Sequence, residues 1–220
     1  MHRALLTVLL IALLPALAAA GKTIYRADQA PGTAEQVEAG KQAFVVCGGC
    51  HGAAGAGVQG LAPRLNSPNW LATVSNAYLA TTIREGRSGS NMVPWDRGLG
   101  EETVDNVVSY IRSWQTLEGI KLDESPLTGD VQTGAALFRD ICAACHGVRG
   151  AGYAAGVDGI GIGRRGYLSV ATNGMIREMV RNGKDKTPME SFTKGSAVII
   201  DDLTAADVDS IIAHLRAQAW

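Results

Sequence analysis

Cysteine, histidine and aromatic residues are scarce in this chain, and each shortage limits what it can do. The 220 residues include four cysteines and four histidines, and aromatic residues make up 5% of the sequence. Beyond the first 20 residues there is no apolar run near the ~20 residues that a membrane-spanning helix needs. The net charge of −1 lacks the positive excess typical of nucleic-acid-binding proteins, so no nucleic-acid partner is expected.

The few cysteines all lie in two short motifs of the same pattern. Segments 47–51 and 142–146 both read Cys-x-x-Cys-His, which is the spacing of covalent haem c attachment. Two thiols on one turn of backbone can add to the vinyl groups of one porphyrin, and the adjacent imidazole can then bind the iron. The motifs therefore predict two haem c groups, with His51 and His146 as proximal iron ligands. The attachment residues would be Cys47, Cys50, Cys142 and Cys145.

Two other uses of a Cys-x-x-Cys pair stay open at this point. Such a pair can be a redox dithiol or half of a zinc site. A redox pair usually lies in a βαβ unit, which this sequence does not indicate. One zinc site built from both pairs would have enough ligands but would leave the histidine after each pair unexplained. Haem attachment is therefore the favoured interpretation.

Residues 1–20 have the features of a secretory signal. Arg3 lies in a short basic segment, residues 4–17 are apolar, and residues 18–20 are Ala-Ala-Ala, so cleavage would leave Gly21 as the first residue. The apolar stretch is short for a spanning helix, although an uncleaved anchor stays open. Because haem attachment to thiols requires export, we expect a periplasmic protein. Membrane contact would come only through partner complexes or an uncleaved N-terminal segment.

The two motifs lie in an internal repeat, which predicts two domains in tandem. Each copy has a Gly-x-x-x-Phe segment before its motif, and a methionine followed three residues later by an aromatic residue after it. The repeated pairs are Gly40 and Gly134, Phe44 and Phe138, Met92 and Met189, and Trp95 and Phe192. The expected divisions are a signal peptide at 1–20, an N-terminal extension at 21–32, a first domain at 33–115, a linker at 116–129 and a second domain at 130–220.

Helix signals occur along both copies, and no strand-like alternation of useful length is present. Thr33 begins a capping box that predicts a helix over residues 34–45. Asp130 can cap the equivalent helix of the second copy, and Thr204 begins a similar box before the last helix. Apolar residues at helical spacing predict a helix over 101–114. The expected fold class is all-α.

With these motifs the chain resembles the class I cytochromes c, as two fused domains. The resemblance implies two tandem cytochrome c-like domains, each a small helical bundle wrapped around a covalently bound haem. In that family the first and last helices cross beside the haem. Gly40 and Gly134 would then allow close backbone approach. The expected aromatic contacts are Phe44 with Tyr110 and Phe138 with His214.

The resemblance also implies residues that orient or pack against each haem. In this family a proline after the haem histidine accepts a bond from the imidazole, and Pro63 fits that role in the first domain. The second domain departs from the pattern, because no proline lies between His146 and Pro188. We expect another backbone carbonyl there, in the loop 158–163. The expected packing residues are Phe44, Trp95, Phe138 and Phe192.

Methionine is the expected sixth ligand of both irons. One histidine would leave with the signal and His214 has a helical packing position, so histidine cannot supply both sixth ligands. Met92 and Met189 lie at matching loop positions, whereas Met175 and Met179 fall in a helical pattern and are interpreted as core. A thioether favours ferrous iron. With both axial positions filled, neither iron would have an open site for a substrate.

These observations indicate a periplasmic dihaem cytochrome c that relays single electrons between a redox donor and a redox acceptor. The first interpretation is a soluble carrier between a quinol-oxidising complex and a terminal oxidase or reductase. The alternative is a dedicated subunit of a larger membrane-associated redox complex. A dihaem enzyme, such as a peroxidase or a thiosulfate-oxidising cytochrome, is less favoured because it needs a labile or non-methionine ligand. No catalytic residue is expected.

Overall fold

The structure, a computed structural model, describes residues 23–193 and 201–220. The segment expected to be a signal, residues 1–20, lies outside the described residues. All regular elements of the described residues are helices, and a β-bridge joins Val58 and Ala62. The expected all-α class is therefore confirmed. No helix of the described residues is long and apolar enough to cross a membrane.

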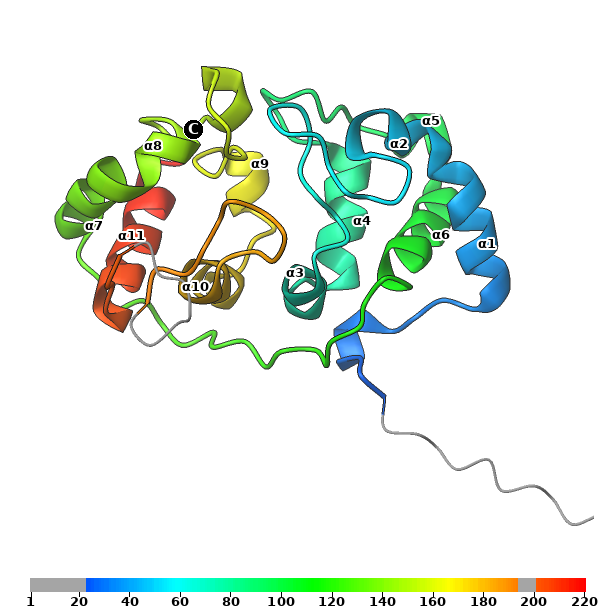
Figure 1. The fold of residues 1–220 in the computed structure, drawn as a ribbon, viewed down its shortest axis with the longest axis horizontal. Helices are drawn as coiled ribbons and strands as arrows, with labels where there is room; N and C mark the ends of the chain where they lie inside the picture. The colour runs from blue at the N-terminus through cyan, green and yellow to red at the C-terminus, as the bar shows by residue number, and fades with distance from the viewer. Residues whose placement is uncertain (1–22, 194–200) are drawn as a thin grey trace, which may run out of the picture.

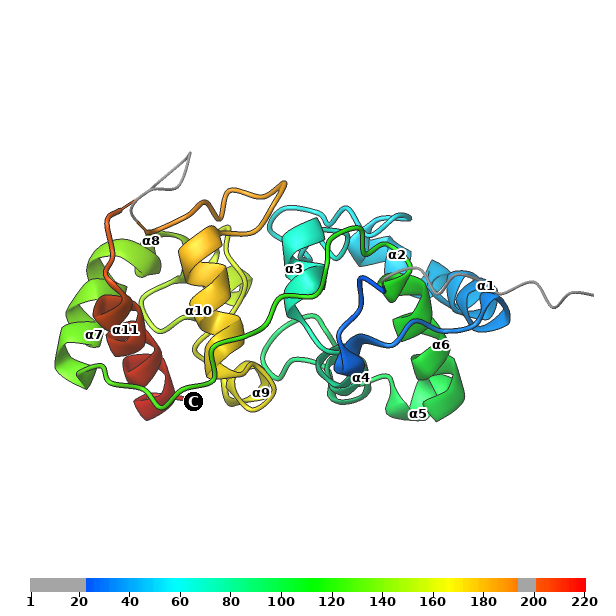
Figure 2. The ribbon, with the colours of Figure 1, turned by 90° about the horizontal axis from the view of Figure 1, so that it is seen from below.

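The helices form two lobes that follow the two halves of the sequence (Figure 1). The first lobe contains η1 (Ala27–Gln29), α1 (Ala34–Ala43), α2 (Val45–His51), α3 (Pro68–Thr73), α4 (Asn76–Glu85), α5 (Asp96–Leu99) and α6 (Glu101–Arg112). The second lobe contains α7 (Val131–Leu137), η2 (Phe138–Cys142), α8 (Ala143–His146), η3 (Gly152–Ala155), α9 (Arg165–Leu168), α10 (Asn173–Asn182) and α11 (Ala205–Ala217). The segment between α6 and α7 runs in extended form from one lobe to the other (Figure 2).

The helix starts expected from the sequence are present. The side chains of Thr33 and Thr204 each accept a hydrogen bond from the backbone N–H three residues later. In both capping boxes, the side chain of that later residue accepts a hydrogen bond from the threonine N–H in return. Asp130 accepts from the Thr133 N–H at 2.7 Å and caps α7. The helix expected over 34–45 ends at Ala43, because a new helix begins at residue 45. In the second copy, the one additional residue before the first cysteine is taken up by the π-helical turn η2.

The first and last helices of each half cross where glycine allows their backbones to meet. A Cβ atom added to Gly40 would overlap the carbonyl oxygen of Asn106 in α6. A Cβ atom added to Gly134 would overlap the carbonyl oxygen of Ser210 in α11. The close approach implied by the family resemblance is therefore confirmed in both halves.

Aromatic rings pack beside each crossing. The ring centroids of Phe44 and Tyr110 are 5.5 Å apart, in an edge-on arrangement. The Phe138 ring and the His214 imidazole are 5.7 Å apart. Both expected pairs are thus in contact, and the two phenylalanines are fully buried.

An arginine repeats near the end of each C-terminal helix, and it is buried at Arg112 and half-buried at Arg216. Arg112 donates to the carbonyl oxygens of Leu71 at 2.7 Å and Val74 at 2.9 Å. These carbonyls lie at the C-terminal end of α3, where they have no partner within the helix. Arg216 makes the equivalent bonds at the end of α9. Burial lowers the pKa of Arg112 to about 10, so the guanidinium stays charged at neutral pH.

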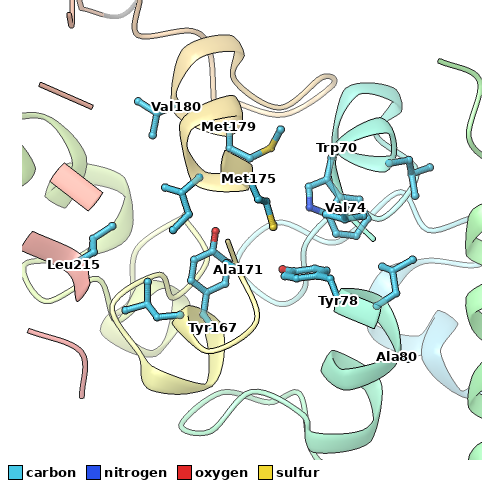
Figure 3. Packing of buried hydrophobic residues seen from close by; sticks show 14 of the residues in the cluster. Trp70, Val74, Tyr78, Ala80, Tyr167, Ala171, Met175, Met179, Val180 and Leu215 are labelled. Atoms are coloured by element: carbon cyan, nitrogen blue, oxygen red, sulfur yellow. The ribbon is translucent and has the colours of Figure 1, made fainter. Parts of the chain in front are cut away.

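The two halves share one continuous core. In Figure 3, Trp70 and Tyr78 of the first half face Tyr167, Met175 and Met179 of the second. Met175 and Met179 are buried in α10, which agrees with their interpretation as core residues. The halves are therefore packed against each other as well as joined by the linker.

Candidate haem sites

The first Cys-x-x-Cys-His motif lies on α2. This seven-residue helix places Cys47, Cys50 and His51 within about one turn, as attachment to one porphyrin requires. Cys50 is exposed and Cys47 is partly buried. The Nδ1 atom of His51 lies 2.9 Å from the carbonyl oxygen of Pro63, the residue to which the family resemblance assigned this role. A proton on Nδ1 donates this bond and leaves Nε2 as the free ligand atom.

The second motif has the same arrangement with a different acceptor. Its Cys145 and His146 lie on the single turn α8, and Cys142 ends η2 directly before it. The Nδ1 atom of His146 lies 2.8 Å from the carbonyl oxygen of Ile160, which lies in the loop 158–163. The N–H of Gly159 donates to the Cys145 carbonyl at 2.7 Å and holds that loop against the motif. Any residue can supply a backbone carbonyl, so sequence alone did not identify Ile160.

Both histidines are held in the form that binds iron. Burial lowers the pKa of His51, the bond to Pro63 opposes that shift, and the charge of Lys184 lowers the pKa further. Burial also lowers the pKa of His146. A neutral imidazole with one nitrogen bonded to a carbonyl is the usual state of a metal-binding histidine. The residues present therefore fit a haem in each half.

Burial acts on the first thiol of each motif. Burial raises the pKa of Cys47. Burial raises the pKa of Cys142 to about 12. Reactive dithiols instead have at least one thiol with a lowered pKa. The pKa values of Cys47 and Cys142 are thus shifted in the direction opposite to that of an attacking thiol.

The zinc alternative fails on geometry. In residues 23–193 and 201–220, no three histidine, cysteine, aspartate or glutamate side chains come together as metal ligands. The motif helices α2 and α8 lie in different lobes (Figure 1). A single zinc site built from both cysteine pairs is thus absent from the described part of the chain.

Met92 and Met189 lie in loops of the same form. Each loop begins with a glycine that ends the preceding helix, Gly86 with φ 67° and Gly183 with φ 69°. A Cβ atom at either glycine would overlap the carbonyl oxygen of the methionine that follows, so both the positive φ and the close approach require glycine. Both methionine side chains are half-buried. The repeat thus preserves the backbone around the two candidate sixth ligands.

The aromatic residues after these methionines are held in equivalent places. The N–H of Trp95 donates to the Ile83 carbonyl, and the N–H of Phe192 donates to the Val180 carbonyl, both at 3.1 Å. Both rings are half-buried and pack against the core. Each bond ties a methionine loop back to the preceding helix.

The N-terminal extension has a structural role that no sequence motif indicates. Gln29 of η1 is fully buried, and its amide donates to the carbonyls of Leu71, Ala72 and Val74 at 2.9–3.1 Å. From sequence alone, a glutamine in a polar segment is expected to be exposed, because no neighbouring residue indicates that its amide will bond carbonyls distant in sequence. The extension, together with Arg112, therefore supplies hydrogen-bond donors to the carbonyls at the C-terminal end of α3.

Comparison with known proteins identifies the class of both halves. Residues 34–111 match the family described as cytochrome C oxidase, cbb3-type, subunit III. Residues 131–219 match the family described as cytochrome c. The chain is therefore composed of two cytochrome c domains, each with its cysteine pair, and it binds two covalent haem c groups. It is an electron-transfer protein.

Two curated relatives are subunits of one kind of oxidase. Subunit FixP of the cbb3-type cytochrome c oxidase of Azorhizobium caulinodans is 37% identical over 121 residues, which cover 51% of this chain and 39% of that protein. Subunit CcoP of the same type of oxidase from Rubrivivax gelatinosus is 33% identical over 161 residues, which cover 69% of this chain and 50% of that protein. The chain thus spans half or less of the length of these curated relatives.

A solved structure supports the fold of most of the chain. The reducing HAO-like protein complex Kustc0457/Kustc0458 of Kuenenia stuttgartiensis contains a chain that superposes with a TM-score of 0.51 at 18% identity. The superposition covers 87% of this chain and 98% of that chain. At this identity the similarity shows the arrangement of the helices and nothing about partners.

Proposed function

We propose that this chain is an electron-transfer subunit of a membrane-bound oxidase complex of the cbb3 type. The observation that carries the proposal is the match of residues 34–111 to a family described as subunit III of that oxidase. The curated relatives cited above are also subunits of this oxidase type. These similarities favour the second interpretation of the sequence, a subunit of a larger complex, over a soluble carrier.

Within this proposal each iron has a histidine and a methionine as axial ligands. His51 and Met92 would bind the first iron, and His146 and Met189 the second. The bonded Nδ1 atoms direct the other imidazole nitrogen away from the carbonyls, and the two methionine loops share one backbone form. The bound haem supplies the one-electron couple. With both axial positions filled, the protein's part is to fix the ligands and exclude other reactions.

The proposed place of the protein is the periplasmic side of a bacterial inner membrane. Residues 1–20 would direct export, and haem attachment would follow it. Residues 33–115 and 130–220 would be the two haem domains, with 116–129 as the linker. Contact with the membrane would come through the partner complex or through an uncleaved N-terminal segment.

The test is a native gel of detergent-solubilised membranes from the source organism, stained for haem and for oxidase activity. We expect the tagged chain to migrate with the oxidase activity, and its deletion to reduce oxygen consumption with a natural electron donor. A matched control replaces Cys142 and Cys145 by serine, which should retain assembly but lose one haem. Recovery of all the haem-stained chain in the soluble fraction, migrating as the free chain apart from any complex, would support the carrier instead.

A further inference from the structure

A lysine of the second half reaches across to the first half. The Nζ atom of Lys184 donates to the carbonyl oxygen of Arg64 at 2.7 Å. The same ammonium group lies 4.4 Å from the centroid of the Trp70 ring, in cation–π geometry. Lys184 thereby contacts two groups of the other domain, and its hydrogen-bond partner Arg64 is 120 residues away in sequence.

An arginine of the first half makes the reciprocal contact. The Nη1 atom of Arg87 donates to the carbonyl oxygen of Gly166 in the second half. The guanidinium carbon lies 5.7 Å from the ring centroid of Tyr167 and 5.2 Å from that of Tyr78. Arg87 and Lys184 follow the two repeated glycines, so the repeat places one basic residue on each side of the interface.

Each of these residues also belongs to a methionine loop. The N–H of Arg87 donates to the Met92 carbonyl at 2.7 Å, and the N–H of Lys184 donates to the Met189 carbonyl at 2.6 Å. Each residue is therefore bonded through its backbone to one methionine loop and through its side chain to the other domain. The candidate sixth-ligand loops are thus part of the domain interface.

The two basic side chains bond to carbonyls in different parts of the opposite domain. The carbonyl bonded by Lys184 belongs to Arg64, directly after Pro63, whose own carbonyl lies 2.9 Å from His51 Nδ1. Arg87 instead ends at Gly166, outside the loop that holds the second histidine. Lys184 therefore connects a methionine loop with the histidine-orienting segment of the other domain.

Further bonds fix the Lys184 loop in place. The N–H of Asn69 donates to Asp185 Oδ2 at 3.1 Å, and the N–H of Asp185 donates to Asn69 Oδ1 at 3.0 Å. The Asn69 amide also donates to the Gly183 carbonyl at 3.1 Å. Residues on both sides of Lys184 are thus held by α3 of the first domain.

We propose that Lys184 is an interdomain positioning residue that sets the potential of the first haem from the second domain. A positive charge near an iron stabilises its ferrous form and raises its reduction potential. Lys184 Nζ bonds the carbonyl of Arg64, the residue directly after Pro63, so its charge lies beside the segment that orients His51. The proposal rests on haem binding at His51, which is part of the proposed function, and is independent of the oxidase partner.

The test is a redox titration of the purified dihaem protein with Lys184→Met and Lys184→Gln. Burial and the charge of Arg64 lower the pKa of Lys184 to about 7, so titration at pH 6 compares the variants with a charged lysine. Both variants should shift the first haem to lower potential. Gln can still donate to the Arg64 carbonyl, so an equal shift in both variants identifies the charge as the cause.

Two controls separate this effect from surface charge and from loosened docking. Lys186→Met removes the same charge from an exposed position two residues on and should move neither potential. Asn69→Ala weakens the interface without a change of charge and should shift the first haem less than Lys184→Met. The first haem is identified as the wave that disappears when Cys47 and Cys50 are replaced by serine.

Three results would overturn the proposal. These are no shift in either Lys184 variant, an equal shift in Lys186→Met, or a shift of the second haem alone. Haem content and circular dichroism verify that each variant is folded and loaded. Because the titration contains no oxidase, a failed assembly with that complex would leave this result unaffected.

Discussion

The buried ion pair between Arg177 and Asp209 is expected to stabilise the second domain, and Asp209→Asn removes its negative charge. Arg177 Nε lies 2.7 Å from Asp209 Oδ1, and Nη2 lies 3.0 Å from Oδ2. The two side chains are 2% and 9% exposed. Loss of one partner of such a pair costs about 3–5 kcal/mol, because the other charge stays buried. Asparagine keeps one acceptor oxygen, and Arg177 keeps bonds to the carbonyls of Asp123 and Ser125, so the lower end of that range is expected.

The first domain contains a matched control. Asp105 holds the equivalent place in α6 and pairs with Arg84 at 2.8 Å, but these side chains are 58% and 33% exposed. Exposed pairs contribute at most about 1 kcal/mol, since water screens both charges. Asp105→Asn should therefore cost much less than Asp209→Asn.

The assay is guanidinium unfolding of the dihaem protein, followed by circular dichroism at several pH values. The bond to Arg177 holds the pKa of Asp209 below its ordinary value. Its stabilisation is complete above the unfolded pKa of ~3.9 and is lost as the pH falls through the folded pKa. The difference between wild type and Asp209→Asn should thus be constant from about pH 5 to 7 and shrink below about pH 4. An equal loss in Asp105→Asn, or a difference unchanged at low pH, would refute the reasoning.

Three further predictions concern the haems and the helix crossing. Replacing Cys142 and Cys145 by serine should reduce the mass by one haem, because each domain attaches its own porphyrin; mass spectrometry under denaturing conditions measures this. Met189→His should lower the potential of one haem in a redox titration, since imidazole favours ferric iron more than a thioether does. Gly134→Ala should destabilise the second domain by about 1–3 kcal/mol, because the added methyl group overlaps the Ser210 carbonyl; thermal unfolding measures this.

Controls for these variants come from the same chain. Met175→Leu should leave both reduction potentials unchanged, together with the weak far-red absorption band of methionine–iron bonding. Loss of that band in Met175→Leu would show that Met175 is the iron ligand. Gly98→Ala adds a methyl group at ordinary contact distance, 3.7 Å from the Trp95 ring, and should leave stability nearly unchanged. Unequal haem masses from the two serine double variants would contradict independent attachment by the two domains.

The local features of this protein could be predicted from the sequence. Each attachment motif spans five residues, so its geometry depends on one turn of backbone and not on the remainder of the fold. Thr33, Asp130 and Thr204 act on N–H groups three residues away, and their helix starts were predicted correctly for the same reason. The repeat, together with the family resemblance, also predicted that glycine and phenylalanine pairs would meet the last helices.

The tertiary structure decided contacts between residues that are distant in sequence and have no pattern of their own. Every residue has a carbonyl, so the acceptor for His146 was found only when the fold brought Ile160 to 2.8 Å. Lys184 is an ordinary loop lysine in sequence, yet the packing of two domains places it on Trp70 and beside the His51 segment. Short-range hydrogen bonds and helical spacing are encoded within a few residues, whereas the partners of a buried charge are set by the whole chain.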